Sequence, residues 1–181
     1  MATTSKTLGI IAAGLTLALA GAAWALDAST TKFLTDAIRG NLAEAKMGQL
    51  AQNHGQSKDV REFGKALMSE RSIAFEKSSS LAEQLGVTAP VEMTAEAAKV
   101  YEAMSKLSAA EFDRQFAAHI VMQHEKDLDA YRDAAVKAGN PKVAAFAEEM
   151  LPTLKMHLAM AQSIDRGLKV AELARKGSAN L

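Results

Sequence analysis

The sequence predicts an all-α protein, a four-helix bundle with a short crossover helix between the second and third long helices. Apolar residues recur every three or four positions in four long segments, which is the spacing of one buried helix face. Three prolines occur and aromatic residues are sparse, whereas alanine and leucine are abundant. Short turns that contain glycine separate the segments, so each helix has a defined end.

Residues 1–25 have the features of a signal peptide. Lys6 is their one charged residue, an apolar run covers Leu8–Ala22, and residues 23–25 (Ala-Trp-Ala) form a small-x-small cleavage site. We therefore expect a mature chain that begins at Leu26 and is exported to the periplasm or secreted. The run is short for a membrane span, so we expect no stable span after cleavage; a retained N-terminal anchor is the alternative.

Charge and cysteine content exclude several classes of function. Without Lys6, 20 basic residues face 21 acidic ones, and no basic patch indicates binding to nucleic acid or to an anionic membrane. The absence of cysteine excludes disulfides, thiolate metal sites and covalent c-type haem attachment. Stability must then come from one packed domain, predicted at residues 26–166, with a C-terminal extension over 167–181.

The first long helix is predicted from Ser29 to Asn53, with Ser29 or Thr30 as its cap and Gly55 just beyond its end. Its inner face consists of Leu34, Ala37, Ile38, Asn41, Ala45 and Gly48. Glu44 lies on the edge of that face. The turn that follows is short, so the next helix should pack antiparallel to the first.

The second long helix is predicted from its cap at Ser57 to Leu85, with Gly86 as terminator. Its apolar row is Val60, Phe63, Leu67, Ala74, Ser78, Leu81 and Leu85. Glu70 and Arg71 interrupt this row at mid-helix, which is unusual for a core. The long connection that follows, over residues 87–107, should contain a helix that begins near Thr94, because long structureless loops are uncommon.

The third long helix begins with a capping box, Ser108 to Glu111, and extends to Ala138. Its buried row is Phe112, Phe116, Ile120, Leu128 and Tyr131. His124 falls in the same row, and an imidazole buried there needs a partner, since an unpaired buried polar group is costly.

The fourth long helix begins at Asn140-Pro141, with proline at the favoured first position. It should bury Val143, Phe146, Met150, Leu154, Ala161 and Ile164. His157 lies in this row too. Beyond Gly167 we expect a weaker helix to about Lys176.

Four polar residues, one from each long helix, fall at similar depth. Glu44, Glu70, His124 and His157 lie 11, 15, 15 and 18 residues from the tight turns that join their helices. At about 1.5 Å of rise per residue, they lie within about 10 Å of one another along the axis. The sequence thus predicts a polar cluster at mid-bundle, with either up-down or ferritin-like connectivity of the helices.

Two interpretations of the cluster are open. In the first, Glu44 and Glu70 satisfy the two histidines, and Arg71 joins a buried ion pair. In the second, the carboxylates and imidazoles bind a transition metal, namely iron, manganese or zinc. The Glu-x-x-His pairs of di-iron bundles are missing, since Val121 and Leu154 precede the histidines at that spacing, so a mononuclear or irregular site would be needed.

Other chemistries have weaker support from the residues. Met150, Met156 and Met160 surround His157 in the sequence and would suit cuprous copper, but methionine is also an ordinary filler of helical cores. Noncovalent haem held by His157 and Met47 is a further alternative. No residues support a hydrolase or a nucleotide-binding protein. We therefore favour a non-enzymatic binding or stress-related protein, with a metal-binding oxidoreductase or metal-handling protein of the same fold as the alternative.

Several motifs occur in the order found in a known family. They are Phe33-Leu34, Asn41-x-x-Glu44, Val60-x-x-Phe63-Gly64, Phe112-Asp113, His124 and Leu151-Pro152-x-Leu154-x-x-His157. Through them, residues 33–164 resemble the exported bacterial ferritin-like proteins classed as domain of unknown function 4142. The resemblance implies an exported four-helix bundle of unestablished role, in which Glu44, His124 and His157 are candidate ligands.

The chain departs from that family in the second helix. The family usually has Asp-His where this sequence has Glu70-Arg71. Glu70 keeps the carboxylate, but Arg71 replaces a possible ligand by a fixed cation that repels a metal ion.

Overall fold

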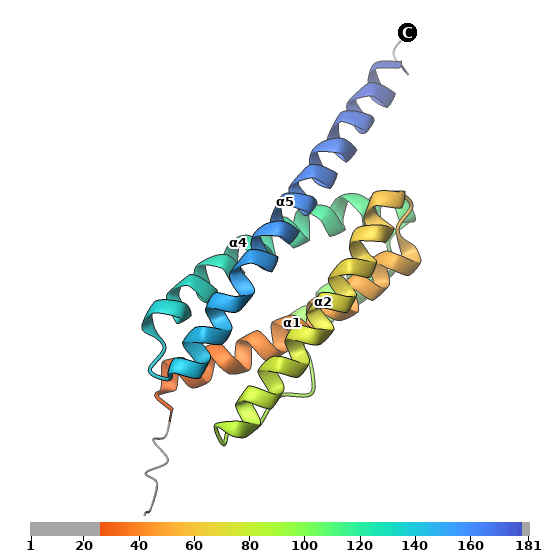
Figure 1. Ribbon diagram of the computed structural model, residues 1–181. Coiled ribbons are helices and arrows are strands. Elements are labelled where there is room, and N and C mark those ends of the chain that lie inside the picture. The colour runs from red at the N-terminus through yellow and green to blue at the C-terminus, as the bar shows by residue number, and fades with distance from the viewer. Residues whose placement is uncertain (1–25, 179–181) are drawn as a thin grey trace, which may run out of the picture.

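The computed structural model describes residues 26–178, with side chains as far as Leu173, and the predicted signal peptide lies outside this range. The described residues form five helices and no strand, which confirms the predicted all-α class. The helices are α1 (Ala28–His54), α2 (Lys58–Gln84), α3 (Ala95–Ser105), α4 (Ala109–Lys137) and α5 (Pro141–Ser178) (Figure 1). None of the helices within 26–178 is both long and apolar enough to cross a bilayer.

The helix ends follow local capping chemistry. Ser57 caps α2 and Ser108 forms the predicted capping box of α4. The cap predicted for the first helix was wrong by two or three residues, since Asp27 caps α1 in place of Ser29 or Thr30. The carboxylate of Asp27 accepts a hydrogen bond from the backbone nitrogen of Thr30 at 2.8 Å, satisfying a free donor of the first turn.

The long helices pack as two antiparallel hairpins, α1 with α2 and α4 with α5 (Figure 1). The hairpins meet where α2 contacts α5 and where α1 contacts α4. Phe63 near the start of α2 packs against Phe116 near the start of α4, with ring centroids 5.9 Å apart. The helices α2 and α4 therefore run in the same direction, and the connection that contains α3 returns the chain between them. Past Gly167, α5 continues unbroken and extends beyond the other helices (Figure 1).

Two hydrophobic clusters form the core, one toward each end of the hairpins. The first includes Leu34, Ile38, Ala74, Leu81, Leu128, Tyr131, Val143 and Leu154. The second includes Met47, Val60, Phe63, Leu67, Phe112, Phe116, Ile120 and Ala161. Between them lies a set of seven side chains that we call the polar layer: Asn41, Glu44, Glu70, Arg71, His124, Asp127 and His157. The apolar rows are thus interrupted at one depth on all four long helices, as the sequence predicted.

The two helices of the first hairpin approach closely, whereas α1 and α4 do not. A Cβ atom added to Gly64 would lie 2.7 Å from the carbonyl oxygen of Gly48, and one added to Gly48 would lie 2.6 Å from the backbone nitrogen of Met68. The backbones of α1 and α2 therefore need glycine at both positions. A Cβ atom added to Gly40, which lines a groove between α1 and α4, would meet nothing within 4 Å.

Candidate functional site

Arg71 is the centre of the polar layer. It is 1% exposed, and its guanidinium contacts side chains of α1 and α4. Its Nε lies 2.6 Å from Oε2 of Glu44, a close charge contact without hydrogen-bond geometry. Its Nη1 donates to Oδ1 of Asn41 at 3.0 Å, and its Nη2 lies 2.8 Å from Nε2 of His124. A buried cation is thus matched by groups from α1 and α4, which offset its loss of solvation.

The contacts of His124 fix its protonation. A guanidinium has no acceptor, so Nε2 of His124 must accept from Arg71. The proton of the neutral ring then sits on Nδ1, which lies 3.1 Å from the carbonyl oxygen of Ile120. Burial, followed by the nearby Arg71 charge, lowers the pKa of His124 to about 3. At neutral pH this histidine is an uncharged acceptor whose two ring nitrogens are both engaged.

Two carboxyl groups share the single guanidinium. Oδ2 of Asp127 lies 3.6 Å from Nη2 of Arg71, and Asp127 also lies beside Glu44. Burial raises the pKa of Glu44, against the opposing effect of Arg71. Burial and then the Glu44 charge raise the pKa of Asp127 to about 7. Near neutral pH the pair therefore holds one proton between two carboxyl groups.

His157 lies on the α5 side of the layer. Its ring is fully buried, packs against the His124 ring at a centroid distance of 5.4 Å, and has a pKa lowered to about 3 by burial and then by Arg71. Its Nε2 is 3.0 Å from Oε2 of Glu70, but neither ring nitrogen has hydrogen-bond geometry to a partner. Glu70 itself is at the margin of the layer, with 37% of its side chain exposed.

The structure brings all four predicted site residues into one layer, but their side chains do not converge on a common position. Glu44 pairs with Arg71 and lies 3.7 Å from Nδ1 of His124, whereas Glu70 pairs with His157. No three His, Asp or Glu side chains in the described part of the chain are grouped as metal ligands. Because Arg71 occupies the Nε2 lone pair of His124, these residues do not fit one metal ion in this arrangement. Metal binding by them stays a prediction.

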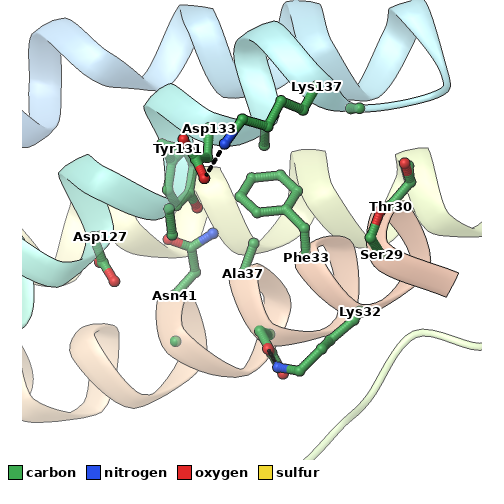
Figure 2. Close-up of a pocket in the computed structure, with 15 residues that line it drawn as sticks. Ser29, Thr30, Lys32, Phe33, Ala37, Asn41, Asp127, Tyr131, Asp133 and Lys137 are labelled. Atoms are coloured by element: carbon green, nitrogen blue, oxygen red, sulfur yellow. Dashed lines mark hydrogen bonds and ion pairs between the residues drawn. The ribbon is translucent and has the colours of Figure 1, made fainter.

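An open groove lies beside the polar layer, between α1 and α4 (Figure 2). Its volume is about 370 Å³. Phe33, Ala37 and Asn41 line it from α1, and Asp127 and Tyr131 line it from α4 (Figure 2). The groove is thus aromatic and aliphatic along its length and ends at two members of the polar layer. Apolar walls with a few convergent polar groups are the usual features of a small-molecule site.

Asn41 connects the groove to the polar layer. It is 2% exposed, and while its Oδ1 accepts from Arg71, its Nδ2 has no hydrogen-bond partner. At the rim, Lys32 pairs with Asp36 and Lys137 pairs with Asp133, each one turn away on its own helix. The groove therefore has neutralised rim charges, and the buried amide of Asn41 lies beside Tyr131 at its inner end.

Sequence reasoning found part of this site and missed two features. The buried ion pair predicted for Arg71 is present, but its partner is Glu44, and Glu70 lies at the margin of the layer. Asp127 was overlooked, yet its spacing of three residues from His124 and four from Tyr131 places it next to the buried face of α4. The groove itself was not predicted. The small residues Ala37 and Gly40 on α1 are the feature of the sequence that could have indicated it.

Comparisons with known proteins identify the family but not an activity. No curated protein is significantly similar to this chain. The crystal structure of a DUF305 fragment from Deinococcus radiodurans is similar in fold, with a TM-score of 0.67 over 78% of this chain and 98% of that chain, at 13% sequence identity. The model of DUF4142, a domain of unknown function, matches residues 16–164. The chain therefore belongs to the DUF4142 family.

Proposed function

We propose that this protein is an exported, non-enzymatic ligand-binding protein with a ferritin-like four-helix bundle fold, and that its ligand occupies the groove between α1 and α4. The observation that carries the proposal is the groove itself, about 370 Å³ in volume, which ends at Asn41 and Asp127 of the polar layer. That volume lies within the usual range of ligand pockets, about 300–1,000 Å³.

The ferritin-like part of the proposal rests on the connection between the hairpins. In an up-down bundle α2 and α4 would be antiparallel, whereas here the starts of both helices pack together through Phe63 and Phe116. A long crossover between two parallel helices that lie diagonally across the bundle is what ferritin-like connectivity requires. Export rests on the signal-peptide features of residues 1–25, and an N-terminus measured at Leu26 in an envelope fraction tests it.

The non-enzymatic part rests on how the titratable groups are used. The histidines are buried and uncharged at neutral pH, and His124 has both nitrogens engaged. A general base must reach the proton it abstracts, and these rings face other side chains of the layer. The layer supports a role in holding the hairpins together and in shaping the inner end of the groove.

The experiment compares two variants that add the same side chain at glycines with open surroundings. Gly40→Phe fills the groove, and Gly167→Phe is the matched control, because a Cβ atom at either glycine meets nothing within 4 Å and Gly167 does not line the groove. Hexanol, hexylamine and hexanoate are titrated while the methyl NMR signals of Ala37 and Ala134 are followed. We expect saturable shifts in wild type and in Gly167→Phe with at least one compound, and none in Gly40→Phe. Unchanged signals with all three compounds in wild type would overturn the proposal.

A metal-handling role is the second candidate, favoured by the unsatisfied ring nitrogens of His157 next to Glu70. Elemental analysis after exposure to iron, zinc, manganese and copper tests it. Stoichiometric metal in wild type that is lost in His157→Ala, with the helical fold retained, would support this candidate. A metal content near zero in wild type would remove it.

A further inference from the structure

The charges of the polar layer do not balance when every carboxyl group near Arg71 is ionised. Glu44 lies 2.6 Å and Asp127 3.6 Å from the guanidinium, so two carboxylates face one cation. The two histidines contribute no charge at neutral pH, because both are buried beside Arg71. One negative charge is left over at Asp127, which also faces the exposed Lys126, and a proton or a cation bound in the groove would neutralise it.

Asp127 is the carboxyl group through which that cation would enter. Its side chain is 30% exposed, against 7% for Glu44, and it lines the groove. Figure 2 shows Asp127 and Asn41 toward the same end of the groove, with Tyr131 beside Asn41 and Phe33 farther along. A ligand in the groove thus meets Asp127 without any rearrangement of the helices.

The walls of the groove select the kind of cation. Phe33 and Tyr131 meet edge to face at a centroid distance of 5.0 Å, and Ala37 and Ala134 add methyl groups. Aromatic and methyl surfaces stabilise an apolar body and, through the rings, an organic cation. A small hydrated metal ion would gain nothing from these walls.

We propose that the groove binds a small amphiphilic amine, with its ammonium group paired to Asp127 and its apolar body against Phe33 and Tyr131. This inference rests on the proposed binding function and names the ligand class for the same groove.

Binding of the amine is coupled to proton release. The groups that face Asp127 or its partner guanidinium are Glu44 from α1, Arg71 from α2, His124, Lys126 and Tyr131 from α4, and His157 from α5. Burial and Glu44 raise the pKa of Asp127 to about 7, so at lower pH the carboxyl pair holds the proton that the ammonium group must replace. The affinity should therefore rise with pH up to about 7, by about tenfold per pH unit well below that value.

The test uses isothermal titration calorimetry of the purified protein with hexylamine, hexanol and hexanoate. We expect hexylamine to bind at least about tenfold more tightly than the other two at neutral pH. Asp127→Asn should remove that preference and the pH dependence. Asp129→Asn is the matched control, since Asp129 is on the same helix and exposed.

Each outcome separates the ligand class from the groove. Hexanol that binds as tightly as hexylamine, in a manner blocked by Gly40→Phe, would refute the amine and keep the groove. Hexylamine binding that persists in Gly40→Phe would place the amine elsewhere and refute this site. If none of the three compounds binds to wild type, both the amine and the binding function fail. Even if Asp127→Asn folds poorly, the relative affinities of wild type for the three compounds show whether the groove prefers the amine.

Discussion

The Nη2 of Arg71 donates to the Nε2 of His124 across 2.8 Å, and this contact joins the two helical hairpins at the middle of the core. It also determines which ring nitrogen of His124 carries the proton, because a guanidinium only donates. His124 is therefore a neutral acceptor in the native state. Arg71 is 1% exposed, so solvent could not replace a partner that a mutation removes.

Arg71→Met should be strongly destabilising. The substitution leaves Glu44 buried without its cation and removes the donor to His124, and breaking a buried pair in this way costs about 3–5 kcal/mol. Urea unfolding followed by circular dichroism measures the change. Lys77→Met, which removes an exposed pair with Glu149, is the control and should cost less than about 1 kcal/mol. Adding Glu44→Gln to Arg71→Met should recover part of the loss, and equal costs for both methionine variants would contradict the role given to Arg71.

Asp127→Asn should become relatively more stable than wild type as the pH rises. The native pKa of Asp127 is raised to about 7, so the native state binds the proton more tightly than the unfolded chain does. Its contribution to stability is complete below about pH 4 and is lost as the pH rises through about 7. The difference in unfolding free energy between variant and wild type should shift by on the order of 2–4 kcal/mol over that window. Parallel stability profiles of the two proteins would contradict the raised pKa.

Acid should weaken the native state through the two histidines. Their native pKa values are lowered to about 3, so the unfolded chain binds protons more readily. Their contribution is complete above about pH 6.5 and is lost as the pH falls toward about 3. Wild type and His157→Phe should therefore differ in the slope of stability against pH within this window, with the shallower slope in the variant. Urea unfolding at a series of pH values measures both slopes.

Gly64→Ala should separate α1 from α2. The added methyl group would lie 2.7 Å from the Cβ of Ala51, the backbone nitrogen of Gln52 and the carbonyl oxygen of Gly48, and backbone atoms cannot turn aside. We expect a loss of about 1–3 kcal/mol, as for other overpacked cores. Gly40→Ala has open space and should instead stabilise α1 by up to about 1 kcal/mol. Thermal unfolding of both variants should shift in opposite directions.

Asp113→Ala should loosen the turn between α1 and α2. The buried carboxylate of Asp113 accepts hydrogen bonds from the backbone nitrogens of Gln56 at 2.9 Å and Ser57 at 2.7 Å. Losing both bonds should cost about 3–6 kcal/mol, since bonds to a charged group contribute about 1.5–3 kcal/mol each. Asp113→Asn keeps one acceptor and should cost less. Amide hydrogen exchange at Gln56 and Ser57 should accelerate in the alanine variant and stay near wild type in Asp129→Ala.

The helices and the depth of the polar layer were predictable because both depend on local geometry. Capping residues fix where α2 and α4 begin, and a constant rise per residue places His124 and His157 at comparable depth. The family resemblance was likewise carried by local motifs and is confirmed by the match over residues 16–164.

The burial of Arg71 in place of Glu70, and the groove, could not be predicted from local helix geometry. Glu70 and Arg71 are adjacent, so a modest rotation of α2 about its axis decides which of them is buried. The groove depends on the distance between α1 and α4, and no pattern within either helix reports that distance. The spacing of Asp127 from His124 and Tyr131 can be seen in the sequence. Its contact with Glu44, however, forms only when the two hairpins dock.

The division of the core by charged groups also limits how the two hairpins fit together. Apolar contacts are nondirectional, so α1–α2 could slide along α4–α5 by one helical turn, about 5.4 Å, at modest cost if the core were uniform. Such a slide would move Arg71 away from His124 and Glu70 away from His157. It would bring Arg71 against Ile120 or Leu128, the apolar residues one turn from His124 on α4. We expect only the native alignment to bury every charge with a partner. Misaligned arrangements of the two hairpins should therefore be less stable and should not persist while the protein folds.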